Sequence, residues 1–266
     1  MTTTKFNILE TNWSKKSIMA NLNDFDEAID FVKENKCDGL QLRSPSVATE
    51  VVPDFKHFEQ IADLLTFLSI DSSNKLKKVK NVDGIYELQN LQKLVLAKEA
   101  IPLDLFKLKK LKEIGLEYSP KLKGLGELAE LEIFVLRKYP KTDLTEFSSL
   151  KNLKTFHIYQ SKIESAKGIE TLTNLEQLNF SLDAVLKDIS EVLSLKKLKK
   201  LHIERCEELI NFSFDTTNTS IKELFISTLS SLKQIENLKG LETINFSDLK
   251  DGDMTPLLKL PSFKEA

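Results

Sequence analysis

Histidine and cysteine are the residues of this sequence best suited to chemistry, and both are scarce. The 266-residue chain has three histidines, His57, His157 and His202, and two cysteines, Cys37 and Cys206. We predict that His157 and His202 lie two strands apart in one sheet, roughly 10 Å, whereas both ligands of a metal ion must lie about 2 Å from it. The cysteines lack the C-x-x-C spacing of zinc and redox sites. We therefore expect no metal site.

Motifs that bind cofactors or activate nucleophiles are absent from the sequence. It contains no G-x-G-x-x-G or P-loop glycine pattern and no nucleophile elbow. A Ser-His-Asp arrangement assembled only in space would leave no such motif. We expect no catalytic residue, no cofactor and no enzyme activity.

The charge balance argues against general nucleic-acid binding. Thirty-eight Lys and Arg face 40 Asp and Glu, a formal net charge of −2, whereas nucleic-acid-binding domains usually carry a basic excess. Lysines cluster at 75–80, 107–112 and 196–200, and in the last two clusters apolar residues interleave them, which is typical of a solvated face. No apolar stretch is long enough to cross a membrane. We expect neither nucleic acid nor a membrane as the partner.

An apolar motif, L-x-x-L-x-L, recurs at steps of about 19 to 26 residues. The copies, with Ile or Phe replacing some leucines, are Leu65-Leu68-Ile70, Leu91-Leu94-Leu96, Leu111-Ile114-Leu116, Leu131-Phe134-Leu136, Leu153-Phe156-Ile158, Leu175-Leu178-Phe180, Leu198-Leu201-Ile203, Ile221-Leu224-Ile226 and Leu241-Ile244-Phe246, then a partial copy at Leu260 and Phe263. The last two apolar positions of each copy point to one face of a strand. The connection then returns the chain to a parallel strand. One repeat buries too little to offset its ordering entropy, so the repeats must stack.

This pattern resembles the leucine-rich repeat family, especially its short bacterial, internalin-like members, over about residues 61–263. The resemblance implies an α/β solenoid with a curved parallel β-sheet on the concave side and short helices or 3-10 turns on the convex side. We expect residues 1–60 to form an N-terminal α/β cap. Residues 61–266 would form about ten repeats, the last one partial.

The sequence departs from the family where the pattern continues L-x-x-N-x-L, in which Asn satisfies backbone groups of the turn. This chain has Glu99, Ser119, Tyr139, Ser161, Asp183, Cys206, Leu229 and Leu249 at that position. Ser, Asp and Cys can replace some of these hydrogen bonds, whereas Tyr and Leu cannot do so in the same way. We expect irregular repeats, most of all after residue 205.

The N-terminal segment has the features of a cap that covers the first repeat. Asp24 and Glu27 fit a capping box, followed by a helix to about Asn35 and a strand over 37–43. A weaker pattern predicts a strand over 5–10, and Trp13 is interpreted as a packing residue of the cap.

A second helix is predicted over 54–64, with Phe55, Phe58 and Ile61 on its buried side. At the other end, the partial repeat at Leu260 is not followed by a dedicated cap. We expect the last strand edge to fray or to self-associate.

Outward-facing residues of successive strands should form columns on the concave face. We predict that this face binds a protein, because Tyr and Arg gather near its middle and both are enriched at interfaces. The predicted contact residues are Lys93, Glu117, Tyr118, Arg137, Lys138, His157, Tyr159, Gln177, Asn179, His202, Glu204, Arg205 and Phe225. The alternative is a merely solvated face, with binding by an edge or by loops.

The function we predict is a protein-interaction module, with an inhibitor or immunity-type protein as the sharper hypothesis, because a rigid surface loses little entropy on binding. Two alternatives stay open. One is an exported internalin-like adhesin or effector that binds a host receptor. The other is an enzyme or nucleic-acid-binding protein that uses the solenoid as a scaffold.

The expected setting is the cytoplasm of a bacterium. The N-terminus shows no signal peptide, two cysteines suit reduced thiols, and Lys, Asn, Ile and Phe are frequent. The partner's identity and the oligomeric state stay open.

Overall fold

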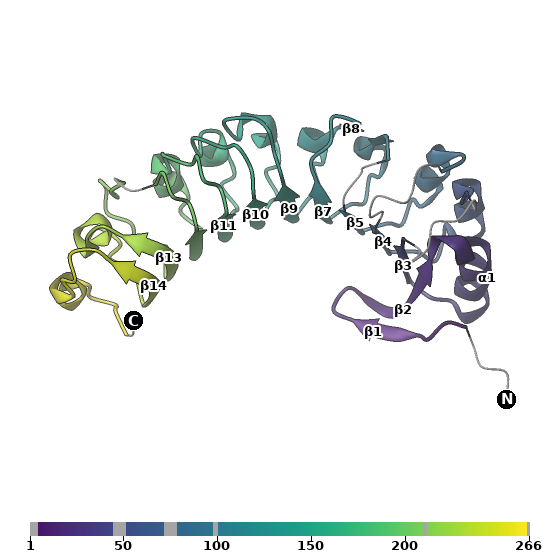
Figure 1. The fold of residues 1–266 in the computed structure, drawn as a ribbon, viewed down its shortest axis with the longest axis horizontal. Coiled ribbons are helices and arrows are strands. Elements are labelled where there is room, and N and C mark those ends of the chain that lie inside the picture. The colour runs from purple at the N-terminus through teal and green to yellow at the C-terminus, as the bar shows by residue number, and fades with distance from the viewer. Residues whose placement is uncertain (1–4, 45–51, 72–78, 98–100, 210–211, 265–266) are drawn as a thin grey trace. The chain divides into compact units, whose positions relative to one another are not determined.

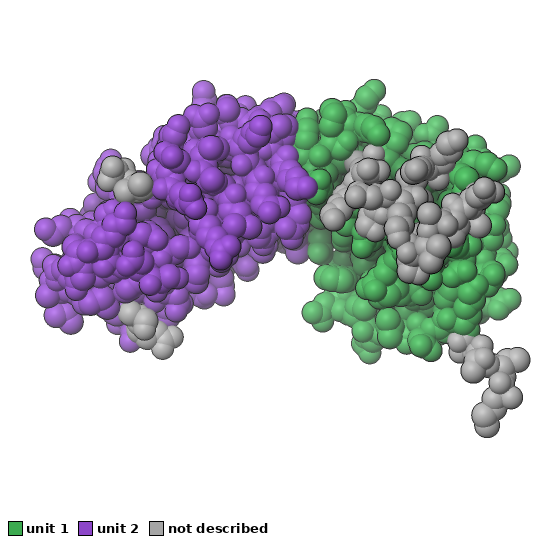
Figure 2. Space-filling view, in the orientation of Figure 1, with its two compact units in different colours: residues 1–130 green, residues 131–266 purple. Residues whose placement is uncertain are grey.

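The computed structural model describes residues 5–44, 52–71, 79–97, 101–209 and 212–264 (Figure 1). The chain forms two compact units, residues 1–130 and 131–266 (Figure 2). Glu99 and the lysines within 75–78 lie outside the described residues. The predicted division assigns a capping role to residues 1–60 and a repeat role to residues 61–266, and it stays a proposal.

The first unit contains one sheet whose strands follow chain order. They are β1 (Leu9–Thr11), β2 (Ser14–Asn21), β3 (Gly39–Arg43), β4 (Phe67–Asp71), β5 (Lys93–Ala97) and β7 (Glu113–Glu117). β1 pairs antiparallel with β2, and the later pairs are parallel. The helices α1 (Phe25–Asn35), η1 (Leu22–Asp24), η2 (Phe55–Ile61), η3 (Val82–Glu87), η4 (Leu105–Lys107) and η5 (Leu125–Glu127) connect them, and the short strands β6 (Leu103–Asp104) and β8 (Leu122–Lys123) pair separately.

The second unit repeats one strand-and-turn element. Its parallel strands are β9 (Ile133–Arg137), β10 (Thr155–Tyr159), β11 (Gln177–Ser181), β12 (Lys200–Glu204), β13 (Glu223–Leu229) and β14 (Thr243–Leu249). The 3-10 helices η6 (Thr145–Phe147), η7 (Ile169–Thr171), η8 (Ser190–Ser194), η9 (Leu232–Ile235) and η10 (Thr255–Lys259) lie on the side of the unit opposite its strands (Figure 1).

The apolar positions of the repeat stack as rungs inside each unit. Leu94 lies opposite Ile114 in the first unit, and Phe134 lies opposite Phe156 in the second. All four are buried, and the rings of Phe134 and Phe156 stack 5.1 Å apart. The rungs predicted from the L-x-x-L-x-L spacing are therefore confirmed.

A backbone ladder joins consecutive repeats just before each strand. The carbonyl oxygen of Glu132 accepts the N–H groups of both Lys154 and Thr155, at 2.8 and 3.0 Å. The carbonyl of Lys154 in turn accepts from Glu176 and Gln177, at 2.8 and 3.0 Å. Because the same bond recurs from strand to strand within each unit, neighbouring repeats of a unit stabilise each other.

Side chains at the family's Asn position hold the turns of the second unit in different ways. The N–H of Ser161 donates to Oδ1 of the fully buried Asp183 at 2.5 Å, and its hydroxyl donates to the same oxygen. The buried Tyr139 donates its hydroxyl to Glu146 at 2.7 Å. Burial raises the pKa of the Cys206 thiol to about 12, which fits a structural turn residue.

The predicted capping box at Asp24 is wrong. The side chain of Asp24 makes no capping hydrogen bond in the described structure, because η1 leads directly into α1 and Asp24 lacks the extended backbone of an N-cap (φ −101°, ψ 22°). Its carboxylate instead lies 2.9 Å from Nζ of Lys5. The helix ends at Asn35, as predicted.

The strand predicted over 5–10 is displaced, because β1 begins at Leu9 and forms a hairpin with β2. β2 was not predicted, because its buried residues include serines. Ser14, for example, donates to Asp38 at 2.7 Å. Trp13 contacts the ring of Phe67 at 5.6 Å but stays 48% exposed.

The second predicted helix is the 3-10 helix η2, and Phe55, Phe58 and Ile61 are buried as expected. The predicted register of the tenth repeat is wrong. The N–H of Lys264 donates to the carbonyl of Glu242 at 2.8 Å, so Lys264 continues the backbone ladder. Leu260 and Phe263 therefore belong to the turn that precedes a strand position.

Candidate functional site

Four side chains lie side by side at the centre of the strand face of the second unit. The strand register pairs His157 with Asn179, Asn179 with His202, and His202 with Phe225. All four are half-buried. The strand register thus confirms that these four predicted residues form a column. We call them the central row.

Stacked rings hold one end of the central row. The rings of His202 and Phe225 are nearly parallel, 6° apart, with centroids separated by 4.2 Å. Nε2 of His202 lies 3.4 Å from Oε2 of Glu204. At the other end His157 meets Tyr159 edge to face at 6.3 Å. Side chains fixed in this way lose little freedom when a partner binds.

A hollow of about 270 Å³ opens over the central row. Its lining consists of His157, Gln177, Leu178, Asn179, Lys200, Leu201, His202, Glu223, Leu224, Phe225, Thr243 and Asn245. Lys200 and Glu223 pair at 2.8 Å, so they offset each other's charge. The hydroxyl of Ser181 donates to Oδ1 of Asn179 at 2.6 Å, which orients the amide nitrogen as a donor for an incoming group.

The electrostatics of the hollow favour neutral hydrogen bonding. Burial lowers the pKa of His157 below its ordinary 6.5, and the nearby His202 adds a smaller effect in the same direction. His157 is therefore neutral at pH 7, with one donor and one acceptor nitrogen. The hollow thus suits polar, uncharged groups and aromatic or apolar side chains.

Arg137 extends this surface at the carboxyl end of β9. Its guanidinium lies 4.5 Å from the ring centroid of Tyr159. Such stacking orients the planar group and leaves its donors for a carboxylate or a carbonyl.

The predicted contact residues fall into two groups. Lys93, Glu117 and Tyr118 belong to the first unit, where Lys93 pairs with Glu113 at 3.2 Å. The other predicted residues belong to the second unit, on or directly beside strands β9 to β13. Their role in binding stays a prediction.

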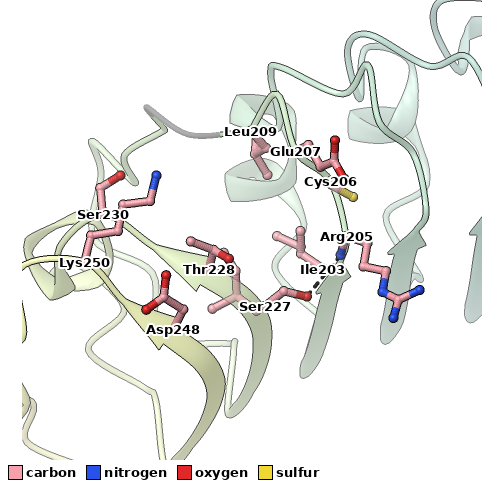
Figure 3. Close-up of a pocket in the computed structure, with 11 residues that line it drawn as sticks. Ile203, Arg205, Cys206, Glu207, Leu209, Ser227, Thr228, Ser230, Asp248 and Lys250 are labelled. Atoms are coloured by element: carbon pink, nitrogen blue, oxygen red, sulfur yellow. Dashed lines mark hydrogen bonds between the residues drawn. The ribbon is translucent and has the colours of Figure 1, made fainter.

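A second hollow, of about 290 Å³, lies at the carboxyl ends of β12 to β14 and was not predicted from the sequence (Figure 3). It exists because β13 and β14 run to seven residues, beyond the end of β12, and Leu229 pairs there with Leu249. Thr228 and Asp248 form one wall, opposite Glu207. The sequence feature that could have indicated this hollow is the pair of leucines at the Asn position. The longer strands β13 and β14 confirm the irregular repeats expected after residue 205.

The described residues contain neither a cluster of metal ligands nor a membrane-spanning helix. There, no group of three or more His, Cys, Asp or Glu residues is placed to hold a metal ion. No helix in these residues is long and apolar enough to span a membrane. His57 belongs to the first unit, where its Nδ1 lies 2.6 Å from Oδ1 of Asp26.

Comparison with known proteins identifies the fold. No family model and no curated protein matches the sequence. Among solved structures, a leucine-rich-repeat protein of Leptospira interrogans is similar, with a TM-score of 0.59 and 19% identity over 89% of this chain and 62% of the other. The internalin InlF of Listeria monocytogenes is also similar, with a TM-score of 0.54 and 16% identity over 88% of this chain and 68% of the internalin chain.

A third similar structure is TLR13 in a complex with ssRNA13, with a TM-score of 0.51 and 19% identity over 85% of this chain and 32% of TLR13. The chain spans less than two thirds of the Leptospira protein. At these identities the similarity concerns the fold alone. With the stacked rungs and parallel strands, it confirms the predicted resemblance: the chain has the leucine-rich-repeat solenoid fold that the internalins share.

Proposed function

We propose that this chain is a protein-binding module and that its partner contacts the strand face of the second unit. The central row carries the proposal, because it combines half-buried aromatic rings, the oriented amide of Asn179 and a hollow in one place. Aromatic and Arg side chains that exclude water supply most of the affinity at protein interfaces. Nucleic-acid binding relies more on clustered Lys and Arg side chains, and the four residues of the central row include neither. We propose no catalytic role.

Within this function we favour an inhibitor or immunity-type protein that sequesters an enzyme or toxin in the bacterial cytoplasm. The supporting argument is the rigidity of the face, since a surface ordered before binding loses less entropy. This finer role rests on analogy of fold. It predicts that the partner is an enzyme or toxin and that the purified chain lowers its activity. Recovery of the chain from the culture medium would favour the exported, internalin-like alternative.

The test is site-specific photo-crosslinking in cells of the source organism. A photoreactive phenylalanine analogue placed at Phe225 should trap a protein partner. The same analogue at the exposed Lys196, on the side with the 3-10 helices, is the matched control. A partner trapped at Phe225 and not at Lys196 supports the proposal. Trapping only at Lys196, or at neither position, contradicts it.

A further inference from the structure

The hollow over the central row has a size that suits one side chain. Its volume of about 270 Å³ lies just below the roughly 300–1,000 Å³ of pockets that hold drug-sized ligands. The strand register places Asn179 between His157 and His202, each one strand away. These two histidines are therefore about 10 Å apart, and the space between them lies over Asn179.

This space is wide enough for one planar ring. The rings of His202 and Phe225 stack 4.2 Å apart, and a ring held between two others needs about twice this separation. Phe225 covers the face of His202 that points away from Asn179, because β13 lies on the far side of β12. Within the described residues, no ring stacks on the other face of His202. One more ring over Asn179 can therefore continue the stack.

Two polar groups beside this space have no hydrogen-bond partner in the described part of the chain. Ser181 donates to Oδ1 of Asn179 at 2.6 Å, whereas Nδ2 of Asn179 makes no hydrogen bond there. His157 contacts the ring of Tyr159, but neither of its ring nitrogens is hydrogen-bonded within those residues. An amide N–H and a neutral imidazole together provide donors and an acceptor. A group that both accepts and donates a hydrogen bond would satisfy both side chains.

The charged groups that line the hollow compensate each other. Nζ of Lys200 lies 2.8 Å from Oε2 of Glu223, and both residues belong to the lining. Burial lowers the pKa of His157, so its ring is uncharged at pH 7. An ammonium or carboxylate group buried in the hollow would lose its hydration without gaining an opposite charge. The hollow therefore favours an uncharged occupant.

Tyrosine is the side chain that combines these features. Its ring is planar, and its hydroxyl both donates and accepts a hydrogen bond while it stays uncharged at pH 7. Phe has no polar group, Trp is only a donor, and Asn and Gln have no ring. Neutral histidine has both a donor and an acceptor, but it becomes a cation near pH 6.5.

We infer that the hollow binds a tyrosine side chain of the partner protein. The tyrosine ring lies between His157 and His202 and continues the stack that His202 forms with Phe225. Its hydroxyl accepts a hydrogen bond from Nδ2 of Asn179 and donates one to a ring nitrogen of His157. This inference rests on the proposed function, since it names the group that the partner places on the central row.

The test compares two peptides, acetyl-Gly-Ser-Tyr-Ser-Gly-amide and the same peptide with Phe in place of Tyr. NMR spectra of the labelled chain report binding through the backbone amides of β11 and the side-chain amide of Asn179. The tyrosine peptide should shift these resonances saturably. Its dissociation constant should be at least threefold lower than that of the phenylalanine peptide, because the hydroxyl adds hydrogen bonds of modest net strength.

Three variants locate the origin of this preference. Asn179→Leu removes the amide and should make the two peptides bind equally. Ser181→Ala removes the hydroxyl that orients the amide and should reduce the preference, although Ser181 itself is buried and does not meet the peptide. The matched control is Gln41→Leu, which removes a half-buried amide at the centre of β3 in the first unit and should keep the full preference.

Several results would overturn the inference. They are no shift at about 5 mM tyrosine peptide, equal binding of the two peptides to the wild type, and a preference that Asn179→Leu leaves unchanged. Tighter binding of uridine than of the tyrosine peptide would assign the hollow to a nucleobase instead. Crosslinking at Phe225 does not depend on which side chain the partner inserts, so the proposed function can hold while this inference fails.

Discussion

Asp183 places an ionisable carboxyl where the family pattern has a neutral amide. Both donors of Ser161 use Oδ1, and Oδ2 has no hydrogen-bond partner within the described residues. Burial raises the pKa of Asp183 to about 6, and the bonds from Ser161 only partly oppose this. A carboxylate ionised in this position is costly, because the fully buried group has lost the hydration that bulk water would give it.

We expect Asp183→Asn to stabilise the fold at neutral pH. Protonated Asp183 favours the folded state, so its contribution is complete below about pH 3.8 and is lost as the pH rises through about 6. Two pH units correspond to about 3 kcal/mol. Urea unfolding at pH 4 and pH 7.5 should show that Asp183→Asn raises the free energy of unfolding only at the higher pH. The exposed Glu208→Gln serves as the control, and an equal gain at both pH values would contradict the explanation.

His157 should titrate at a lower pH than a free histidine. Its burial opposes protonation, and the charge of His202 opposes it further. The contribution of neutral His157 to the free energy of unfolding is complete above about pH 6.5 and is lost as the pH falls through the depressed pKa. An NMR titration should find the pKa of His157 below 6.5, and His202→Asn should move it part of the way back. A value unchanged in His202→Asn would show that the two rings are not coupled.

At the scale of the element, the repeat spacing determines the strands because the apolar period imposes both their register and their stacking. The central row followed from that period, since alternate residues of a strand share a face. The parallel stacking of His202 on Phe225 could not be predicted from this period, because it depends on side-chain rotamers. The left-handed backbone of Leu182, with φ of 61°, could not be predicted either, because turn geometry leaves no trace in the apolar pattern.

The N-terminal segment, which we predict to act as a cap, was the least predictable part of the chain. The Asp24 to Glu27 pattern matched a capping box, but the preceding 3-10 helix set a backbone that excludes it. β2 buries Ser14 and Ser17, whose hydroxyl groups donate to Asp38 and to the carbonyl of Leu9, so its pattern lacked the apolar alternation of a strand. Tertiary context thus overrode local sequence signals at both places.

Gln160, directly after β10, has a left-handed backbone with φ of 54°, and the strain of this turn can be measured there. Gln160→Gly should raise the free energy of unfolding by up to about 1 kcal/mol, because glycine adopts a positive φ without steric cost. Gln160→Val should lower it, since a β-branched residue is least compatible with this backbone. Chemical denaturation of both variants gives the comparison. Equal stability of the two would mean that the turn relaxes and stores no strain.

At the scale of the whole molecule, each unit is held by contacts between neighbouring repeats. Exposed ion pairs such as Glu132 with Lys154 add little individually, about 0–1 kcal/mol. The buried rungs and the backbone ladder therefore dominate, and stability should be cooperative along each unit. A rigid array of this kind suits a binding surface that is formed before its partner arrives.

Protection of the backbone amides from hydrogen exchange should decrease along the second unit toward β14. Phe246 and Leu249 are half-exposed, whereas Phe180 at an equivalent inner position is fully buried, and Leu258 nearby is 88% exposed. Fewer buried contacts permit local opening at lower free energy. Hydrogen exchange should therefore be faster for amides of β14 than for those of β11, in a sample shown to be monomeric by sedimentation. Self-association would instead slow the exchange of β14 as concentration rises, and equal protection of the two strands in the monomer would count against fraying.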